Sequence, residues 1–292
     1  TSYPGGAPAN VACALVKLGT PSAFIGAVGE DESGKELVKL LEEVGVDTNG
    51  VQRHPEAPTR QVLVTRKENG DRVFSGFKDY DSAEFADTRL KAAELPEQLF
   101  AAAEILVIGT LELAYPETGA AVYRALELAS QHYVKILLDV NWRDVFWKNP
   151  DAAPDKIREL IKKVDFLKLA KEEAELLFNT YDAGAITYRL NSVEGVLVTD
   201  GDKGCAYCLG ENEDKFSAFS VPVVDTTGAG DSFVAGFVHQ LLQTGIQNLK
   251  DAEVVKKIIA YASAAGALTT LKPGAIASQP TAEEVENFLK EN

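Results

Sequence analysis

Short apolar runs alternate with amphipathic segments along most of the chain. Five runs predict strands, at 23–28, 105–109, 134–139, 165–169 and 195–199. Six amphipathic segments predict helices, at 31–44, 117–131, 155–163, 172–178, 229–244 and 252–270. Continuous apolar strands separated by helices are typical of a parallel sheet that is buried between helical layers. The pattern therefore predicts one α/β domain over residues 1–292.

One segment departs from this alternation. Residues 61–66 and 72–77 have the composition of strands, and they flank the turn sequence Glu68-Asn69-Gly70-Asp71. They predict a β-hairpin within 59–78, which forms a small separate sheet at the edge of the main domain.

The composition excludes several classes of protein. Apolar residues make up 46% and charged residues 25% of the 292 residues, as in ordinary globular domains. The formal net charge of −15 disfavours nucleic acid and anionic membranes as partners. The longest apolar stretches are far too short to span a bilayer. Three cysteines cannot build a disulfide framework, so we expect a reducing compartment such as the cytoplasm.

Two of the cysteines, Cys205 and Cys208, have the Cys-x-x-Cys spacing that also occurs in metal and redox sites. A zinc site needs two more ligands, and Cys13 and the histidines are far apart in the sequence. In a strand, positions 205 and 208 face opposite sides. We therefore expect structural cysteines. The histidines, which show no clustering and predict no site, are His54, His132 and His239.

The sharpest motif is a glycine-rich turn before a predicted helix. It reads Asp225-Thr226-Thr227-Gly228-Ala229-Gly230-Asp231 and follows a strand-like run at 219–224. Glycines let a backbone approach a ligand closely, and the free N–H groups of a first helical turn favour an anion. Asp231 lies in that turn, where its carboxylate can accept a proton from a hydroxyl group. The motif indicates phosphoryl transfer to an alcohol, and the alternative is a capping Asp in a plain turn.

This stretch resembles the C-terminal signature of the ribokinase-like (PfkB) carbohydrate kinases. The opening Gly5-Gly6-Ala7-Pro8-Ala9-Asn10 resembles the N-terminal signature of the same family. The segment Asp139-Val140-Asn141-Trp142-Arg143, with Trp147 after it, is similar to the fructokinase branch. The resemblance implies a three-layer α/β/α sandwich with a mostly parallel central sheet, in which the hairpin is a small β lid. It also implies an ATP-dependent sugar kinase, with fructose as the expected acceptor.

The resemblance implies a role for each matching residue. Asp231 would be the general base, and Gly228, Ala229 and Gly230 would form the anion hole for the terminal phosphate. Gly5, Gly6 and Asn10 would contact the sugar, because an amide can both donate to and accept from hydroxyl groups. From the sequence alone, Asn10 could instead cap a helix that begins at Val11.

Further residues would hold the nucleotide and its ions. Arg143 follows the predicted strand at 134–139, where ligands of open α/β sheets gather, and would bind a phosphate or the sugar. The alternative for Arg143 is a surface ion pair with Asp144. Glu173 would organise Mg²⁺ through water. The expected nucleotide residues are Thr199, Gly201, Gly204, Gly274 and Ala275, and the expected ligands of a monovalent cation, K⁺, are Asp225 and Thr227.

Two other functions compete with the fructokinase prediction. The acceptor could be ribose, a nucleoside or a keto-deoxy sugar acid. The chain could also be a catalytically silent relative that serves as a structural partner. We expect a homodimer through the lid, and residues before Thr1 that carry the first strand of the family. A transit peptide there would change the expected compartment from cytoplasm to plastid. The sequence contains no methionine, which suggests that some residues are missing from it.

Overall fold

A six-stranded sheet forms the centre of the molecule in this computed structural model, which describes residues 4–66, 72–77 and 80–292. The strand order is β10-β9-β8-β7-β6-β5. The strands are β5 (Ile105–Ile108), β6 (Lys135–Asp139), β7 (Phe166–Ala170), β8 (Gly195–Thr199), β9 (Cys205–Leu209) and β10 (Asn212–Phe216). β5 to β8 are parallel, whereas β9 and β10 join in antiparallel fashion. The four parallel strands coincide with predicted apolar runs.

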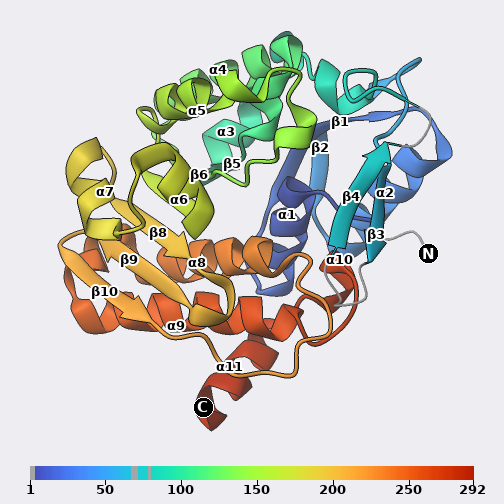
Figure 1. The fold of residues 1–292 in the computed structure, drawn as a ribbon. Coiled ribbons are helices and arrows are strands. Elements are labelled where there is room, and N and C mark those ends of the chain that lie inside the picture. Colours follow the sequence, from blue (N-terminus) through green and yellow to red (C-terminus); the bar gives the residue numbers. More distant parts are fainter. Residues whose placement is uncertain (1–3, 67–71, 78–79) are drawn as a thin grey trace.

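Helices cover both faces of this sheet (Figure 1). Side chains alternate between faces along a strand, so Leu167 joins one core cluster and Phe166 the other. The first face carries α4 (Pro116–Gln131), α5 (Ala153–Ile161), α6 (Lys171–Phe178) and α7 (Ala183–Leu190). The second carries α1 (Ala7–Lys17), α8 (Ala229–Thr244), α9 (Ala252–Thr269) and α11 (Ala282–Glu291). The remaining short helices are α3 (Glu97–Ala102) and α10 (Ala275–Ser278). The predicted three-layer α/β/α sandwich is confirmed.

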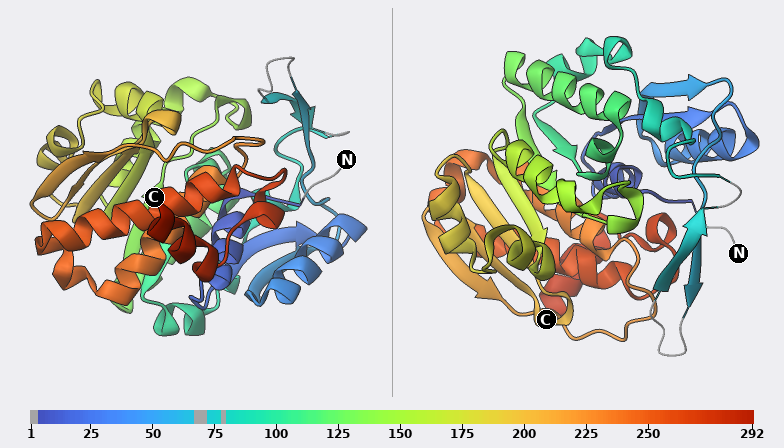
Figure 2. Two further views of the ribbon diagram at one scale, coloured as in Figure 1. Left: turned by 90° about the horizontal axis from the view of Figure 1, so that it is seen from below. Right: turned by 45° about the horizontal axis from the view of Figure 1, so that its top comes forward.

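A second, two-stranded sheet consists of the parallel strands β1 (Ala23–Gly29) and β2 (Asp47–His54), joined through α2 (Glu32–Val44). Within the described residues, no ladder of hydrogen bonds joins β1 to β5, so the two sheets are separate. The sequence pattern does not predict β2, because its residues are mostly polar and only partly buried. Figure 2 shows this sheet at one end of the molecule.

The predicted hairpin forms a third sheet, in which β3 (Val62–Arg66) pairs antiparallel with β4 (Arg72–Phe77). It projects from the body beside α10 (Figures 1 and 2). The predicted turn at 68–71 lies outside the described residues, as does part of the predicted range 59–78.

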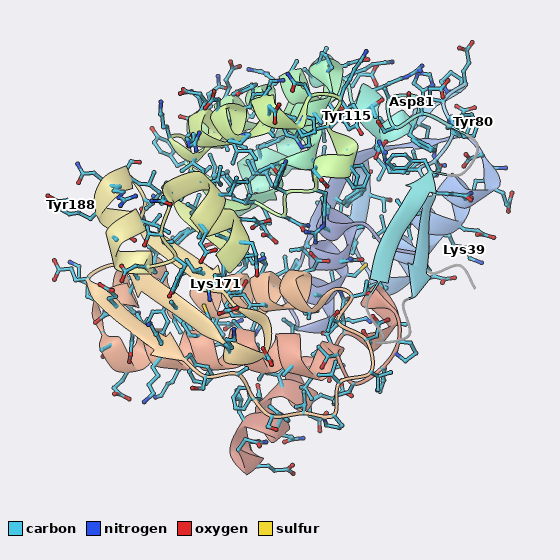
Figure 3. All side chains as sticks on the ribbon, viewed as in Figure 1. Lys39, Tyr80, Asp81, Tyr115, Lys171 and Tyr188 are labelled. Carbon is cyan, nitrogen blue, oxygen red and sulfur yellow. The ribbon has the colours of Figure 1, made fainter. Side chains whose placement is uncertain are left out.

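Arg60 fastens the base of this hairpin to the body. Its Nε and Nη2 donate to the two carboxylate oxygens of Asp87 at 2.6 and 3.0 Å. Four aromatic rings surround the guanidinium carbon at 4.7–5.5 Å from their centroids: Phe77, Phe85, Tyr115 and Phe146. We call these four rings the aromatic cage of Arg60. Phe77 belongs to β4, so the cage joins the hairpin to other parts of the chain. Figure 3 shows Tyr115, one of these four rings, near the top of the view.

The strand predicted at 219–224 is wrong. This segment has no regular structure, and Val223 and Val224 are 58% and 57% exposed. The backbone N–H groups of Val224 and Asp225 donate to the carbonyl of Thr270, at the end of α9, instead of to a neighbouring strand. The apolar residues therefore lie on a loop that leads into α8.

The two cysteines of the Cys-x-x-Cys segment face opposite sides of the sheet, as predicted. Cys13, Cys205 and Cys208 are free and buried, and the last two belong to core clusters on opposite faces of the sheet. Across the parts of the chain described above, none of the helices has the length and apolar character needed to cross a bilayer.

Candidate active site

The start of α8 forms the centre of the site. Gly228 precedes the helix with φ +80°, a left-handed conformation that favours glycine. A Cβ atom at Gly228 would lie 2.9 Å from the Cβ of Ala275, so glycine is also required by space. The turn thus brings two of the predicted segments, 225–231 and 274–275, into contact.

Three backbone N–H groups at this helix start are available to a ligand. Those of Gly228, Gly230 and Asp231 have no hydrogen-bond partner among the described residues. The N–H of Ala229 instead donates to the carbonyl of Thr226 at 3.2 Å. The predicted anion hole therefore differs in detail, since the amide of Asp231 is free whereas that of Ala229 is engaged. Unpaired N–H groups and the helix dipole make this position favourable for phosphate.

Asp231 lies in the first turn of α8 and is 9% exposed. Burial raises the pKa of its carboxyl group to about 6. The hydrogen bond from Asn10 lowers the pKa, Asp139 raises it, and Lys168 and Arg143 lower it. A carboxylate with a pKa near 6 is ionised at neutral pH and still accepts a proton readily, as a general base must.

Asn10 lies inside α1, which begins at Ala7 after the N-cap residue Gly6, so the alternative that Asn10 caps the helix is wrong. Its Nδ2 donates to Oδ2 of Asp231 at 2.7 Å, and both side chains are buried. Its Oδ1 is buried without a partner among the described residues and lies 3.6 Å from a Cβ position on Gly5. The two signature segments thus meet at Asp231, and one acceptor of Asn10 remains for a ligand.

A buried ion pair that the sequence pattern does not predict lies beside Asp231. Nζ of Lys168, on β7, donates to Oδ1 of Asp139, at the end of β6, at 2.9 Å. Both side chains are 8% exposed. Burial lowers the pKa of Lys168, but the carboxylates of Asp139, Glu173 and Asp231 raise it above its ordinary value. The signal in the sequence was a lysine inside an otherwise apolar strand.

Glu173 holds two backbone segments together. Its Oε1 accepts from the N–H of Trp142 at 2.8 Å, and its Oε2 from the N–H of Ala170 at 2.7 Å. Burial raises the pKa of its carboxyl group. These two hydrogen bonds position the loop after β6. Each oxygen keeps a second lone pair, which suits a hydrogen bond from a water molecule bound to Mg²⁺.

Arg143 lies in that loop and is exposed. Its Nη1 donates to the carbonyl of Trp142 at 3.2 Å. Oδ1 of Asp144 accepts from the N–H of Val145, and these two described residues, Arg143 and Asp144, form no ion pair. The guanidinium is close enough to lower the pKa of Asp231, so its positive charge acts on the carboxylate at the start of α8.

The predicted nucleotide residues fall on two loops. Oγ1 of Thr199 donates to the carbonyl of Leu169 at 3.3 Å, at the end of β8. A Cβ at Gly204 would lie 1.9 Å from the carbonyl oxygen of Phe216, so packing alone requires this glycine. The turn at 200–204, which includes Gly201, connects to the start of α6, because Nζ of Lys171 donates to Asp200 at 3.2 Å.

The second loop, at 274–275, is joined to the turn before α8 by hydrogen bonds to Asp225. Oδ1 of Asp225 accepts from the N–H and Oγ1 of Thr227 at 3.0 and 2.8 Å, and Oδ2 accepts from the N–H of Gly274 at 3.0 Å. Asp225 is buried, and its oxygen donors suit a hard cation such as K⁺. Within the described residues, no group of three or more His, Cys, Asp or Glu side chains is arranged to hold a metal.

Known proteins resemble this chain in sequence and in fold. The family model "pfkB family carbohydrate kinase" matches residues 1–282. "Probable fructokinase-5" of Arabidopsis thaliana is 36% identical over 290 residues, which are 98% of this chain and 88% of that protein. The structure of fructokinase with bound ATP from Xylella fastidiosa has a TM-score of 0.90 at 27% identity and covers 98% of this chain and 90% of that one.

A further solved structure that is similar to this chain contains bound ligands. It is a fructokinase double mutant from Vibrio cholerae O395 in its fructose, ADP and potassium ion bound form. Its TM-score is 0.87 at 27% identity, and the match covers 99% of this chain and 91% of that chain. The fold, the two signature segments and the matched length lead to one conclusion: the chain belongs to the pfkB family of carbohydrate kinases, enzymes that transfer a phosphoryl group from ATP to a sugar.

Proposed function

We propose that this protein is a fructokinase, which transfers the terminal phosphoryl group of ATP to a hydroxyl group of fructose. The observation that carries the proposal is the pairing of a buried carboxylate, Asp231, with free N–H groups in one helical turn. The fructokinases similar to this chain support fructose as the acceptor.

The reaction follows from these groups. Asp231 accepts the proton of the sugar hydroxyl as its oxygen forms a bond to the terminal phosphorus. The bond between that phosphorus and the bridging oxygen breaks, and ADP leaves with the electron pair. The N–H groups of Gly228, Gly230 and Asp231 stabilise the negative charge on the transferring group. Mg²⁺, when bound with ATP, neutralises charge on the β- and γ-phosphates.

Other residues are proposed to bind the substrates. The Gly5-Gly6 segment and Oδ1 of Asn10 contact the sugar, and Arg143 contacts a phosphate. The loops at 199–204 and 274–275 border the nucleotide. Asp225 and Thr227 would hold a K⁺ ion, and Glu173 would accept a hydrogen bond from water bound to Mg²⁺.

An acceptor panel tests the proposal. The purified chain is mixed with MgATP and fructose, ribose, adenosine or a keto-deoxy sugar acid, and ADP release is measured. We expect the highest kcat/KM with fructose. A preference for another acceptor would replace fructose while leaving the kinase intact. Absence of ADP release with every acceptor, together with no calorimetric heat of ATP binding, would identify a silent relative.

We also propose a homodimer in which β3–β4 hairpins pair, since this sheet is separate from both others. Light scattering after size exclusion tests it, and a monomeric mass at micromolar concentration refutes it. We propose the cytoplasm as the compartment, with free buried cysteines as support. The plastid is the alternative, and imaging of the full-length protein separates the two.

A further inference from the structure

Lys168 carries a buried ammonium group that uses only part of its hydrogen-bonding capacity. An ammonium group has three N–H donors. Within the described residues, the only recorded hydrogen bond of Nζ is the one to Asp139 at 2.9 Å. The side chain is 8% exposed, so two donors are buried without a protein acceptor. Such donors cost free energy unless a ligand or water accepts from them.

Another lysine of the same sheet shows what a purely structural pair looks like here. Lys135 begins β6, and its Nζ donates to both Asp165 and Glu194, at 2.8 and 2.6 Å. Lys135 lies at the amino end of β6, whereas Asp139 lies at its carboxyl end. It is more exposed than Lys168, at 35%, and yet it has one more partner. Pairing with Asp139 therefore accounts for only one of the three N–H donors of Lys168.

The unused donors of Lys168 lie beside the helix start. A Cβ atom on Gly230 would be 3.5 Å from Nζ of Lys168, so the ammonium group is directly next to the turn with the free N–H groups. Because residue 230 has no side chain, nothing from that residue covers the ammonium group. The N–H groups of Gly228, Gly230 and Asp231 and this ammonium group thus lie close together at the start of α8.

We propose that Lys168 is a further phosphate-binding residue, which donates to an oxygen of the transferring phosphoryl group of ATP while Asp139 holds its side chain in place. The inference rests on the proposed function as a kinase, but not on the identity of the sugar. A fixed positive charge here offsets the negative charges of Asp139, Glu173 and Asp231, which would otherwise repel ATP. No bond to Lys168 forms or breaks during transfer.

The test must separate phosphate binding from the role of a counter-ion to Asp139. Lys168→Met removes the charge and keeps the length of the side chain, but it leaves Asp139 buried and unpaired. The double variant Lys168→Met/Asp139→Asn removes both charges and restores a neutral pair. Lys135→Met is the matched control, because it removes a lysine from the same sheet at the end away from the site. Tm, kcat, and the calorimetric affinities for ATP and for ADP are measured on the full chain.

We expect Lys168→Met and the double variant to lose at least about tenfold in ATP affinity, the usual effect of losing a hydrogen bond to a charged group. The affinity for ADP should change by less than about threefold, because ADP lacks the terminal phosphate. The double variant should regain most of the Tm, while its kcat stays about 10²-fold or more below wild type. Lys135→Met should lower Tm with kcat unchanged.

Two outcomes overturn the inference. In the first, the double variant recovers kcat together with Tm, which makes Lys168 a counter-ion only. In the second, ATP and ADP affinities fall by the same factor, which places Lys168 away from the terminal phosphate. Both readouts of nucleotide affinity need no sugar, so they stand even if fructose is not the acceptor. Failure of the wild-type chain to bind ATP would instead refute the proposed function itself.

Discussion

Nδ2 of Asn10 donates a hydrogen bond of 2.7 Å to the carboxylate of Asp231, although 221 positions separate the two residues in the sequence. Both side chains are buried, so water does not compete strongly for either group. The bond joins α1 to α8 and fixes the orientation of the carboxylate. The pKa of Asp231, the proposed general base, therefore depends on a residue from the other end of the chain.

Asp231→Asn should lower kcat by about 10²–10⁴-fold, the usual contribution of a general base, with the ATP affinity within about threefold of wild type. The amide keeps the shape of the side chain but accepts no proton from the sugar. Steady-state kinetics with the best acceptor and calorimetry with ATP measure the two quantities. Activity close to wild type would remove Asp231 from the reaction.

The same variant should be more stable than wild type at pH 8. The pKa of Asp231 is raised from 3.8 to about 6 in the folded state, so the folded protein binds this proton more tightly than the unfolded chain does. The favourable contribution is present below pH 3.8 and is lost as the pH rises through about 6. The difference in unfolding free energy between Asp231→Asn and wild type should grow from pH 4 to pH 8, by up to about 3 kcal/mol. Urea titrations at the two pH values measure it, and a constant difference contradicts the raised pKa.

Asn10→Ala should move the acid limb of the kcat/KM profile to higher pH. The hydrogen bond from Asn10 favours the ionised form of Asp231, so its loss raises the pKa of the base further. The pH–rate profile between pH 5 and 8 measures the shift. Cys13→Ala, one turn further along α1, serves as the control and should leave the limb in place. A limb that stays fixed in Asn10→Ala would show that the bond does not set the pKa.

Gly228→Ala should destabilise the protein by about 1–3 kcal/mol and abolish most activity. The new Cβ would be strained at φ +80° and would lie 2.9 Å from the Cβ of Ala275. Gly19→Ala is the matched control, because φ is +89° there and nothing lies within 4 Å of a Cβ. Denaturant unfolding of both variants separates the cost of the backbone angle from the cost of the contact. Equal losses would mean that Ala275 gives way.

Arg60→Lys should lower stability by about 2 kcal/mol. Lysine cannot make the bidentate contact to Asp87 or stack its charge against four rings as a planar group can. Arg124→Lys changes a half-buried arginine of a surface ion pair with Glu127 and should have an effect within about 0.5 kcal/mol. Unfolding curves of the two variants that coincide would show that the cage does not hold the hairpin.

The sequence was sufficient to predict the parts of the fold that depend on local pattern. The apolar runs of β6 to β8 are mostly buried on both faces, that of β5 is partly buried, and the lengths of all four match the strands closely. β2 could not be predicted in this way, since its polar residues leave no pattern of alternation. The run at 219–224 misled for the opposite reason, because its valines are apolar but exposed on a loop.

The candidate site, too, could be predicted from the sequence only in part. Asp231 and the glycines of 228–230 were predicted from adjacent residues. The partners of Asp231 could not be predicted, because Asn10 and Lys168 reach it only when α1 and β7 pack beside α8. Gly204 fits a sequence motif, and yet the carbonyl of Phe216 explains it without a ligand.

The carboxylate of Asp225 ties the N–H of Thr227, just before the catalytic helix, to the N–H of Gly274, at the start of α10. These two strips of backbone are consequently unable to shift independently of each other. A nucleotide that displaced the loop at 274–275 would pull the anion-binding turn in the same direction. If ATP binds as proposed, contact of its base with the loop at 274–275 would therefore also shift the N–H groups that are proposed to bind its terminal phosphate.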